Sequence, residues 1–150
     1  MKKVKNFIDF LECPLVNGII FPNGVIKLLD VNVEWSPKLI YTIKKSEETS
    51  IKALEKIGHL QWNDCAILTK LSDEKKNIVV IAGEGDYGSD GFVSVIDLYS
   101  RKLIWLAFFN CSNPFEKLEI KNDELLVKST NGCLWKFNIL DPVNIVVDCC

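Results

Sequence analysis

The sequence predicts a mainly β, antiparallel fold with one short α-helix. Most of the chain consists of short runs rich in Val, Ile, Leu and aromatic residues, and Gly, Asp, Asn and Ser separate these runs. That pattern is typical of strands joined by tight turns. Only one stretch has the apolar period of a helix. The 150 residues fit a single domain over 1–150, and an apolar fraction of 48% is enough for a substantial core.

The clearest element is the stretch 90–109, which we expect to form two strands, 92–98 and 103–109, joined by a polar turn. Its pattern occurs three times in the chain. Each copy has a turn dipeptide, a strand that ends near an Asp or Asn, a polar break and an apolar strand. The three turn dipeptides are Asn23-Gly24, Asp90-Gly91 and Asn131-Gly132.

Further strands are expected on both sides of the helix. The helix itself is predicted to begin at Ser46, to present Ile51, Leu54 and Ile57 on one face for about three turns, and to end at Gly58. Residues 1–16 fit either a short helix or a strand, and Pro14 ends either one. The remaining expected strands are 18–21, 25–31, 39–43, 65–69, 78–81, 118–121, 125–129, 134–139 and 143–147.

The spacing of the turn dipeptides adds a further level of organisation. From Gly91 to Gly132, about 41 residues hold four expected strands, which is typical of one β-propeller blade. Residues 17–148 resemble the β-propeller repeat families of the WD40 and PQQ-like kinds, with Asp30, Asp97 and Asn138 near the strand ends where a Trp-Asp pair would stand. The resemblance implies an open half-propeller of about three blades, since a closed ring needs at least four. Such a stack leaves an edge or face for a partner to cover.

Charge and hydropathy exclude several functional classes. Eighteen basic and 20 acidic residues give a net charge of −2, so the chain lacks the basic excess that direct nucleic-acid binding requires. No run reaches the ~18 apolar residues of a membrane helix. The basic N-terminus is followed by Asp9 and Glu12 rather than by an apolar signal segment. We therefore expect a soluble, cytoplasmic protein without membrane contact.

The six cysteines do not form a recognisable metal or disulfide pattern. No C-x-x-C pair occurs, so the spacings indicate neither a zinc site nor a compact disulfide framework. Cys65 and Cys133 lie in expected strands and are interpreted as buried small hydrophobes. Cys149 and Cys150 end the chain, where fraying is expected. In the cytoplasm the thiols are expected to be reduced.

The loop 83–91 is the main candidate binding element because it combines Glu84, Asp86, Tyr87 and Asp90. A calcium site fits poorly, since Gly88 brings no side-chain ligand and no bidentate Glu follows. A phosphate site fits less well, because carboxylates repel phosphate and no P-loop Lys is present. Two interpretations stay open: a plain flexible loop, or an acidic contact loop for a basic partner. No metal or cofactor is expected.

The tryptophans divide into two pairs. Trp105 and Trp135 lie inside expected strands and are predicted to pack in the core. Trp35 and Trp62 stand beside polar residues and are contact candidates, because exposed Trp often anchors interfaces. Together with Glu34 and Asp64, they form a second candidate patch.

No catalytic constellation is visible in the chain. His59 is the only histidine, and no nucleophile or acid is placed to act with it. We therefore expect a protein that is not an enzyme. Hydrolytic activity that depends on His59 would contradict this expectation.

The overall type resembles the immunity proteins of bacterial contact-dependent growth inhibition systems: small, acidic, free of catalytic groups, and rich in Lys, Ile and Asn. The resemblance implies a tight complex with a basic toxin domain, with a nuclease as the first expectation, whose active site it covers. The contact residues would be Glu84, Asp86, Tyr87 and Asp90, with Glu34, Trp35, Trp62 and Asp64 as the second patch. The alternative is a propeller-like structural or adaptor protein that forms a homodimer through its open edge.

Overall fold

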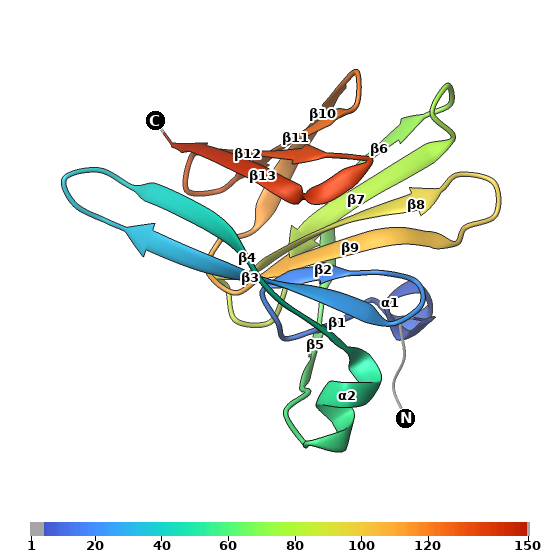
Figure 1. Ribbon diagram of the computed structural model, residues 1–150. Helices are drawn as coiled ribbons and strands as arrows, with labels where there is room; N and C mark the ends of the chain where they lie inside the picture. The colour runs from blue at the N-terminus through green and yellow to red at the C-terminus, as the bar shows by residue number, and fades with distance from the viewer. Residues whose placement is uncertain (1–4, 150) are drawn as a thin grey trace.

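The computed structural model describes residues 5–149 and shows an antiparallel, mainly β fold, as predicted (Figure 1). A seven-stranded sheet has the order β4-β3-β2-β9-β8-β7-β6, and a four-stranded sheet has the order β10-β11-β12-β13. A third, two-stranded sheet pairs β1 with β5. The elements are α1 (Lys5–Phe10), β1 (Glu12–Pro14), β2 (Gly18–Ile20), β3 (Val25–Glu34), β4 (Ile40–Ser50), α2 (Ile51–Lys56), β5 (Trp62–Asp64), β6 (Ala66–Asp73), β7 (Ile78–Glu84), β8 (Gly91–Asp97), β9 (Leu103–Phe109), β10 (Phe115–Lys121), β11 (Glu124–Ser129), β12 (Cys133–Asn138) and β13 (Asp141–Cys149).

The predicted helix is present but shorter than expected, and its predicted start at Ser46 is wrong. Residues up to Ser50 belong to β4, because they pair with β3 as far as Val25↔Ser50. Ser50 is the actual N-cap and accepts a hydrogen bond from the Ala53 N–H at 3.0 Å. The chain turns away at Gly58, whose φ of +72° favours glycine. Within residues 5–149 there are two short helices, since α1 occupies part of the ambiguous N-terminal segment.

The arrangement of about three blades is not confirmed. Strands β6–β9 and strands β10–β13 are each four-stranded antiparallel meanders, as a blade would be. Strands β2–β4, however, do not stack as a separate layer. Their strand β2 pairs edge to edge with β9, for example Ile19↔Ala107, and so extends the β6–β9 meander into one wide sheet.

The main core fills the space between the two large sheets. Trp105 and Trp135 are both buried there, as predicted. The Trp135 ring packs against Tyr41, Phe109 and Phe115 with centroid separations of 5.2, 4.7 and 5.4 Å. The Trp105 Nε1–H donates to the Ile139 carbonyl at 2.9 Å. This contact ties the end of the four-stranded sheet to the middle of the wide one.

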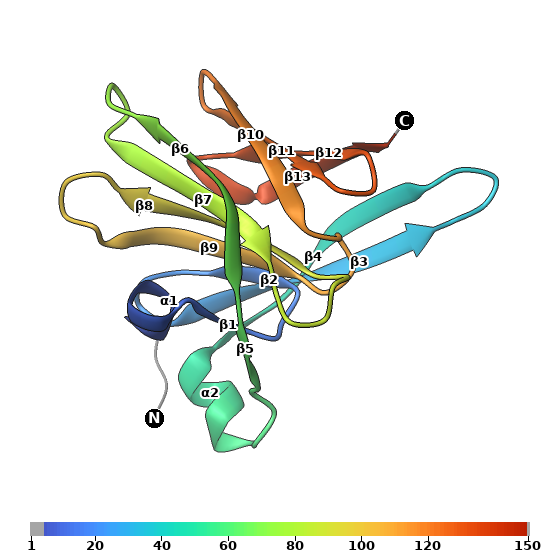
Figure 2. The same cartoon turned by 180° about the vertical axis from the view of Figure 1, so that it is seen from behind.

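A second core covers the opposite face of the wide sheet. In β9, alternate residues point to opposite faces, so Trp105 and Phe109 enter the main core while Leu106 and Phe108 enter the second one. Phe7 of α1 packs edge-on against Phe92 at 5.7 Å. Helix α1 and strands β1 and β5 lie over this face (Figure 2). Because both faces are buried, β9 is a nearly continuous apolar run rather than an alternating one.

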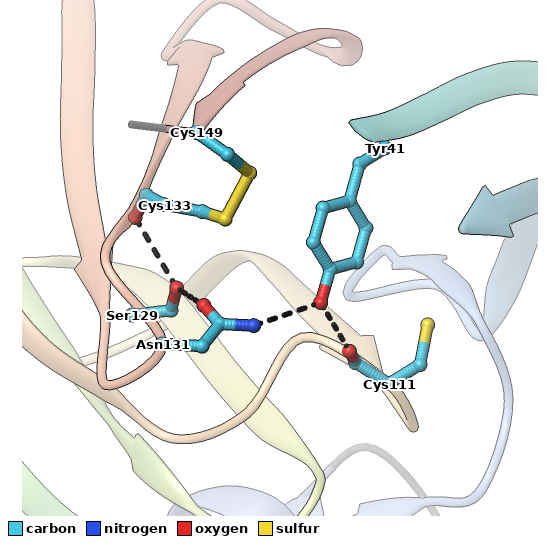
Figure 3. Close-up of a disulfide and its surroundings, with 6 residues drawn as sticks. All are labelled: Tyr41, Cys111, Ser129, Asn131, Cys133 and Cys149. Carbon is cyan, nitrogen blue, oxygen red and sulfur yellow. Dashed lines mark hydrogen bonds between the residues drawn. A yellow bond between two sulfur atoms is a disulfide. The ribbon is translucent and has the colours of Figure 1, made fainter. Parts of the chain in front are cut away.

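A disulfide joins the last two strands, which corrects the expectation that these cysteines are reduced and that Cys149 frays. Cys133 and Cys149 lie directly opposite each other in the β12–β13 register and are bonded (Figure 3). Strand β13 extends beyond the predicted end at residue 147, and this extension brings Cys149 to Cys133.

A polar network beside this disulfide fixes β4 to the four-stranded sheet (Figure 3). The Tyr41 hydroxyl donates to the Cys111 carbonyl at 2.7 Å and accepts from Asn131 Nδ2 at 3.0 Å. Burial raises the pKa of Tyr41, against the lowering effect of the Asn131 hydrogen bond. Ser129 donates in turn to Asn131 Oδ1. The turn Asn131-Gly132, one of the three repeated dipeptides, is therefore also a tertiary contact.

The described helices are short. Among residues 5–149, no helix has the length and apolar character that a membrane span requires.

Candidate functional site

Strands β1 and β5 form a small two-stranded arm, here called the β1–β5 arm. Its register is Glu12↔Asp64, Cys13↔Asn63 and Pro14↔Trp62. Two flanking backbone hydrogen bonds extend the pairing, from Leu15 N to Gln61 O and from Cys65 N to Leu11 O, both 2.9 Å. The arm places Asn63 next to the loop 85–90, which connects β7 to β8.

Asn63 and Asp90 hold this loop in one conformation. The Asn63 Nδ2–H donates to Asp90 Oδ2 at 2.9 Å, and Asn63 Oδ1 accepts from the Asp86 N–H at 3.1 Å. Asp90 Oδ1 accepts from the Gly85 N–H at 3.0 Å. Both side chains are buried, at 2% and 1% exposure. We call this pair the Asn63–Asp90 clamp.

The clamp leaves no room for a side chain at residue 85. A Cβ on Gly85 would lie 2.3 Å from Asn63 Nδ2 and 2.5 Å from Asp90 Oδ2. On the other side of the loop, the Ser89 hydroxyl donates to the Asn110 carbonyl at 3.1 Å and the Asn113 N–H donates to the Ser89 carbonyl at 2.8 Å. Hydrogen bonds thus hold the loop at both ends, which does not fit the interpretation of a plain flexible loop.

The clamp changes the role of one predicted contact residue. Asp90 is buried at 1% exposure, so it holds the loop and lines the adjoining pocket rather than standing on the exposed tip. The tip of the loop is available instead: Asp86 is exposed and the Tyr87 side chain is 68% exposed. Glu84, at the end of β7, is partly exposed.

The second predicted patch does not exist as one surface. Trp62 and Asp64 lie on the β1–β5 arm, where Asp64 is exposed and Trp62 packs partly against the second core. Glu34 and Trp35 lie at the tip of the β3–β4 hairpin. That hairpin projects from the body well away from β5 in both views (Figures 1 and 2). The structure therefore places Asp64 in β5 directly after Asn63, the residue that contacts the acidic loop, and separates Glu34 and Trp35 from that loop.

A shallow pocket of about 360 Å³ adjoins the loop. Its lining combines an apolar part with polar groups and one buried carboxylate. The residues are Leu15, Val16, Tyr87, Ser89, Asp90 and Asn110. Sequence reasoning missed Leu15, Val16, Asn110 and the clamp residue Asn63, because their proximity depends on the pairing of β1 with β5 and of β2 with β9.

The exposed carboxylates near the loop have no basic partner among the residues that the structure describes. Within residues 5–149, no Lys, Arg or His forms an ion pair with Asp64, Glu84 or Asp86, and the buried Asp90 carboxylate contacts only neutral donors. We call the exposed group formed by Asp64, Glu84, Asp86 and Tyr87 the acidic face. It offers negative charge and an aromatic ring, which suit recognition of basic side chains.

Neither a catalytic histidine site nor a metal site is apparent in the described part of the chain. His59 is exposed in the connection between α2 and β5. In the described part of the chain, no three His, Cys, Asp or Glu side chains are grouped closely enough to hold a metal ion.

Comparison of the chain with protein-family models, curated proteins and solved structures found no match.

Proposed function

We propose that this protein is an inhibitor of the immunity type, which binds a basic bacterial toxin domain and covers its active site. The observation that carries the proposal is the acidic face, held in place by the buried Asn63–Asp90 clamp. A nuclease is the expected toxin class, since nucleases present basic surfaces to their substrates.

Preorganisation supports binding rather than catalysis. The loop that carries Asp86 and Tyr87 is already fixed by hydrogen bonds to Asn63, Asp90 and the Asn110 carbonyl. A fixed loop loses little conformational entropy when a partner binds, so more of the contact energy becomes affinity. The unpaired carboxylates would speed association with a basic surface.

The adjoining pocket fits the side chain of a Lys or Arg from the partner. Leu15 and Val16 would contact the aliphatic stem, while the Tyr87 ring and the Asp90 carboxylate would receive the charged end. Such a residue, buried near the centre of an interface, typically contributes ~2 kcal/mol or more to binding.

The experiment that tests the proposal uses the gene next to the one for this chain. If that gene encodes a secreted protein with a variable C-terminal domain, the domain is expressed together with this chain. The proposal expects the two proteins to co-purify and the domain's toxic activity to be suppressed. A toxin domain that remains fully active at equimolar inhibitor contradicts the proposal.

A second candidate function is self-association through the β6 edge. Strand β6 ends the wide sheet, and its Ile67 and Leu68 side chains are 48% and 47% exposed. An exposed apolar edge strand is a template for pairing with another copy. Light scattering during size-exclusion chromatography separates the two functions: a stable dimer that Leu68→Lys converts to a monomer favours the scaffold, and a monomer favours the inhibitor.

The proposed site of action is the cytoplasm, and the cysteines provide a test of it. In a reducing compartment Cys133 and Cys149 are expected to exchange to thiols, whereas an oxidising one preserves their bond. Rapid alkylation of thiols in intact cells, followed by mass spectrometry, distinguishes these states. A fully bonded pair in cells would contradict the cytoplasmic assignment.

A further inference from the structure

Two cysteines that are 52 positions apart meet at the β1–β5 arm. The Sγ atoms of Cys13 and Cys65 are 2.8 Å apart. The register explains this proximity: Cys13 lies opposite Asn63, and Cys65 follows two residues later while its N–H still pairs with Leu11 O. Neither residue was expected to have a cysteine partner, because nothing in the sequence indicates that β1 pairs with β5.

The two sulfur atoms differ in their access to solvent. Cys13 is fully buried, and Cys65 is only partly buried. Burial raises the pKa of the Cys13 thiol well above its usual value, and the Cys65 hydrogen bond and the nearby charges of Cys65 and Asp90 act in the same direction. An external reagent therefore reaches Cys65 first, and Cys13 stands directly behind it.

We propose that Cys13 and Cys65 form a dithiol modification site that a small-molecule disulfide, of the oxidised glutathione type, converts into an intramolecular disulfide. In the first step, the Cys65 thiolate attacks one sulfur of the reagent. A mixed disulfide forms on Cys65, and one reagent thiolate leaves. In the second step, Cys13 loses its proton and attacks Cys65 Sγ. The Cys13–Cys65 bond forms and the second reagent thiolate leaves. The protein loses two hydrogens, and the reagent is reduced to two thiols.

The bond would close the β1–β5 arm covalently. The arm carries Asn63, which accepts the Asp86 N–H and donates to Asp90. Oxidation is therefore expected to restrict opening of the arm and to protect the Asp86 amide from hydrogen exchange. The thiol chemistry itself does not depend on any toxin partner and goes beyond the proposed function.

The remaining cysteines provide internal controls. Cys111 is partly buried with no second cysteine bonded to it, and burial raises its pKa. Cys133 and Cys149 already form a bond. A protein with Cys111→Ser and Cys150→Ser retains only the two pairs at issue. This background makes each thiol or disulfide in the mass spectrum assignable.

The test is oxidation of the purified, mildly reduced protein by oxidised glutathione, followed by peptide mapping under non-reducing conditions. The expected product has lost about 2 Da for the new bond and yields a cross-linked peptide that contains Cys13 and Cys65. A thermal midpoint about 5–10 °C higher than that of the dithiol form is expected, since the bond closes a long loop. Amide exchange at Asp86 should slow severalfold.

Two outcomes overturn the proposal. Either Cys65 retains a stable glutathione adduct in the parent protein, or both cysteines remain thiols. If the bond forms but exchange at Asp86 is unchanged, the coupling to the loop is wrong. The variant Cys13→Ser should retain the mixed disulfide on Cys65, because no second thiol resolves it. Even if this variant does not fold, peptide mapping of the oxidised parent protein shows whether the Cys13–Cys65 bond forms.

Discussion

Asn63 and Asp90 are 27 positions apart, yet the Asn63 amide donates to the Asp90 carboxylate at 2.9 Å in a buried setting. This contact joins the β1–β5 arm to the loop that follows β7. It also explains how a loop rich in Gly and Asp presents its exposed residues in one arrangement.

Replacement of Asn63 by Ala should destabilise the protein by about 2 kcal/mol. The Asp90 carboxylate and the Asp86 N–H would each lose a partner, and Asp90 is buried. Urea unfolding followed by fluorescence measures the change. The matched control is Asn32→Ala, an exposed site in β3, where a change below about 0.5 kcal/mol is expected. Equal effects at the two sites would show that the clamp does not stabilise the loop.

The two core tryptophans should respond differently to replacement by Phe. Trp105 Nε1 donates to the Ile139 carbonyl at 2.9 Å, whereas Trp135 Nε1 has no hydrogen-bond partner among the described residues. Both changes remove similar volume, but only Trp105→Phe breaks a buried hydrogen bond. Trp105→Phe should therefore cost about 1 kcal/mol more in unfolding free energy. A larger loss for Trp135→Phe would contradict the assigned contacts.

The strands of residues 90–109 could be predicted from the sequence because their signals are local. Runs of branched and aromatic residues favour strands, and Ser100 to Lys102 marks the turn. The start of α2 could not be predicted in the same way. Ser46 and Ser50 are both plausible N-caps, and only the pairing of β4 with β3, a tertiary effect, selects Ser50.

The candidate site was predicted only in part for a similar reason. The acidic loop could be found from its composition, but the burial of Asp90 depends on Asn63, which a three-residue strand places beside it. A strand of three residues is too short to show the alternation of apolar and polar side chains from which strands are predicted. The separation of Trp35 from Trp62 likewise follows from the length of the β3–β4 hairpin and not from the residues around each tryptophan.

Loss of the Cys133–Cys149 bond should lower stability. The two residues are directly opposite in the β12–β13 register and 16 positions apart, so the bond restricts the unfolded chain by about 3 kcal/mol in the chain-entropy model. The double change Cys133→Ser and Cys149→Ser, compared with the parent protein in urea, measures this difference. The single change Cys111→Ser serves as the control. If the double variant equals that control, the bond does not contribute to stability.

Acid should weaken the β8–β9 turn through Asp97. Hydrogen bonds from Ser100, and then from the Tyr99 N–H and the Asn77 side chain, lower the pKa of the Asp97 carboxyl. Because the folded-state pKa lies below the unfolded one, this contribution is present above the unfolded pKa and is lost as pH falls through the folded pKa. Urea unfolding between about pH 7 and pH 3 should therefore show a smaller acid-induced loss in Asp97→Asn than in the parent. An identical pH dependence in both proteins would contradict the role of Asp97.

The acidic face is proposed to bind a basic partner, and reversal of its charge should abolish most of this binding. The test variant replaces three residues of the acidic face: Asp64→Lys, Glu84→Lys and Asp86→Lys. The control variant makes the same charge change at exposed positions of the β3–β4 hairpin: Asp30→Lys, Glu47→Lys and Glu48→Lys. The measurement is the Kd for the neighbouring gene's toxin domain by titration calorimetry, after circular dichroism has shown that both variants are folded. We predict a loss of affinity of about 100-fold or more for the first variant and less than about tenfold for the second. Equal losses in both variants, or no loss in the first, would contradict the claim.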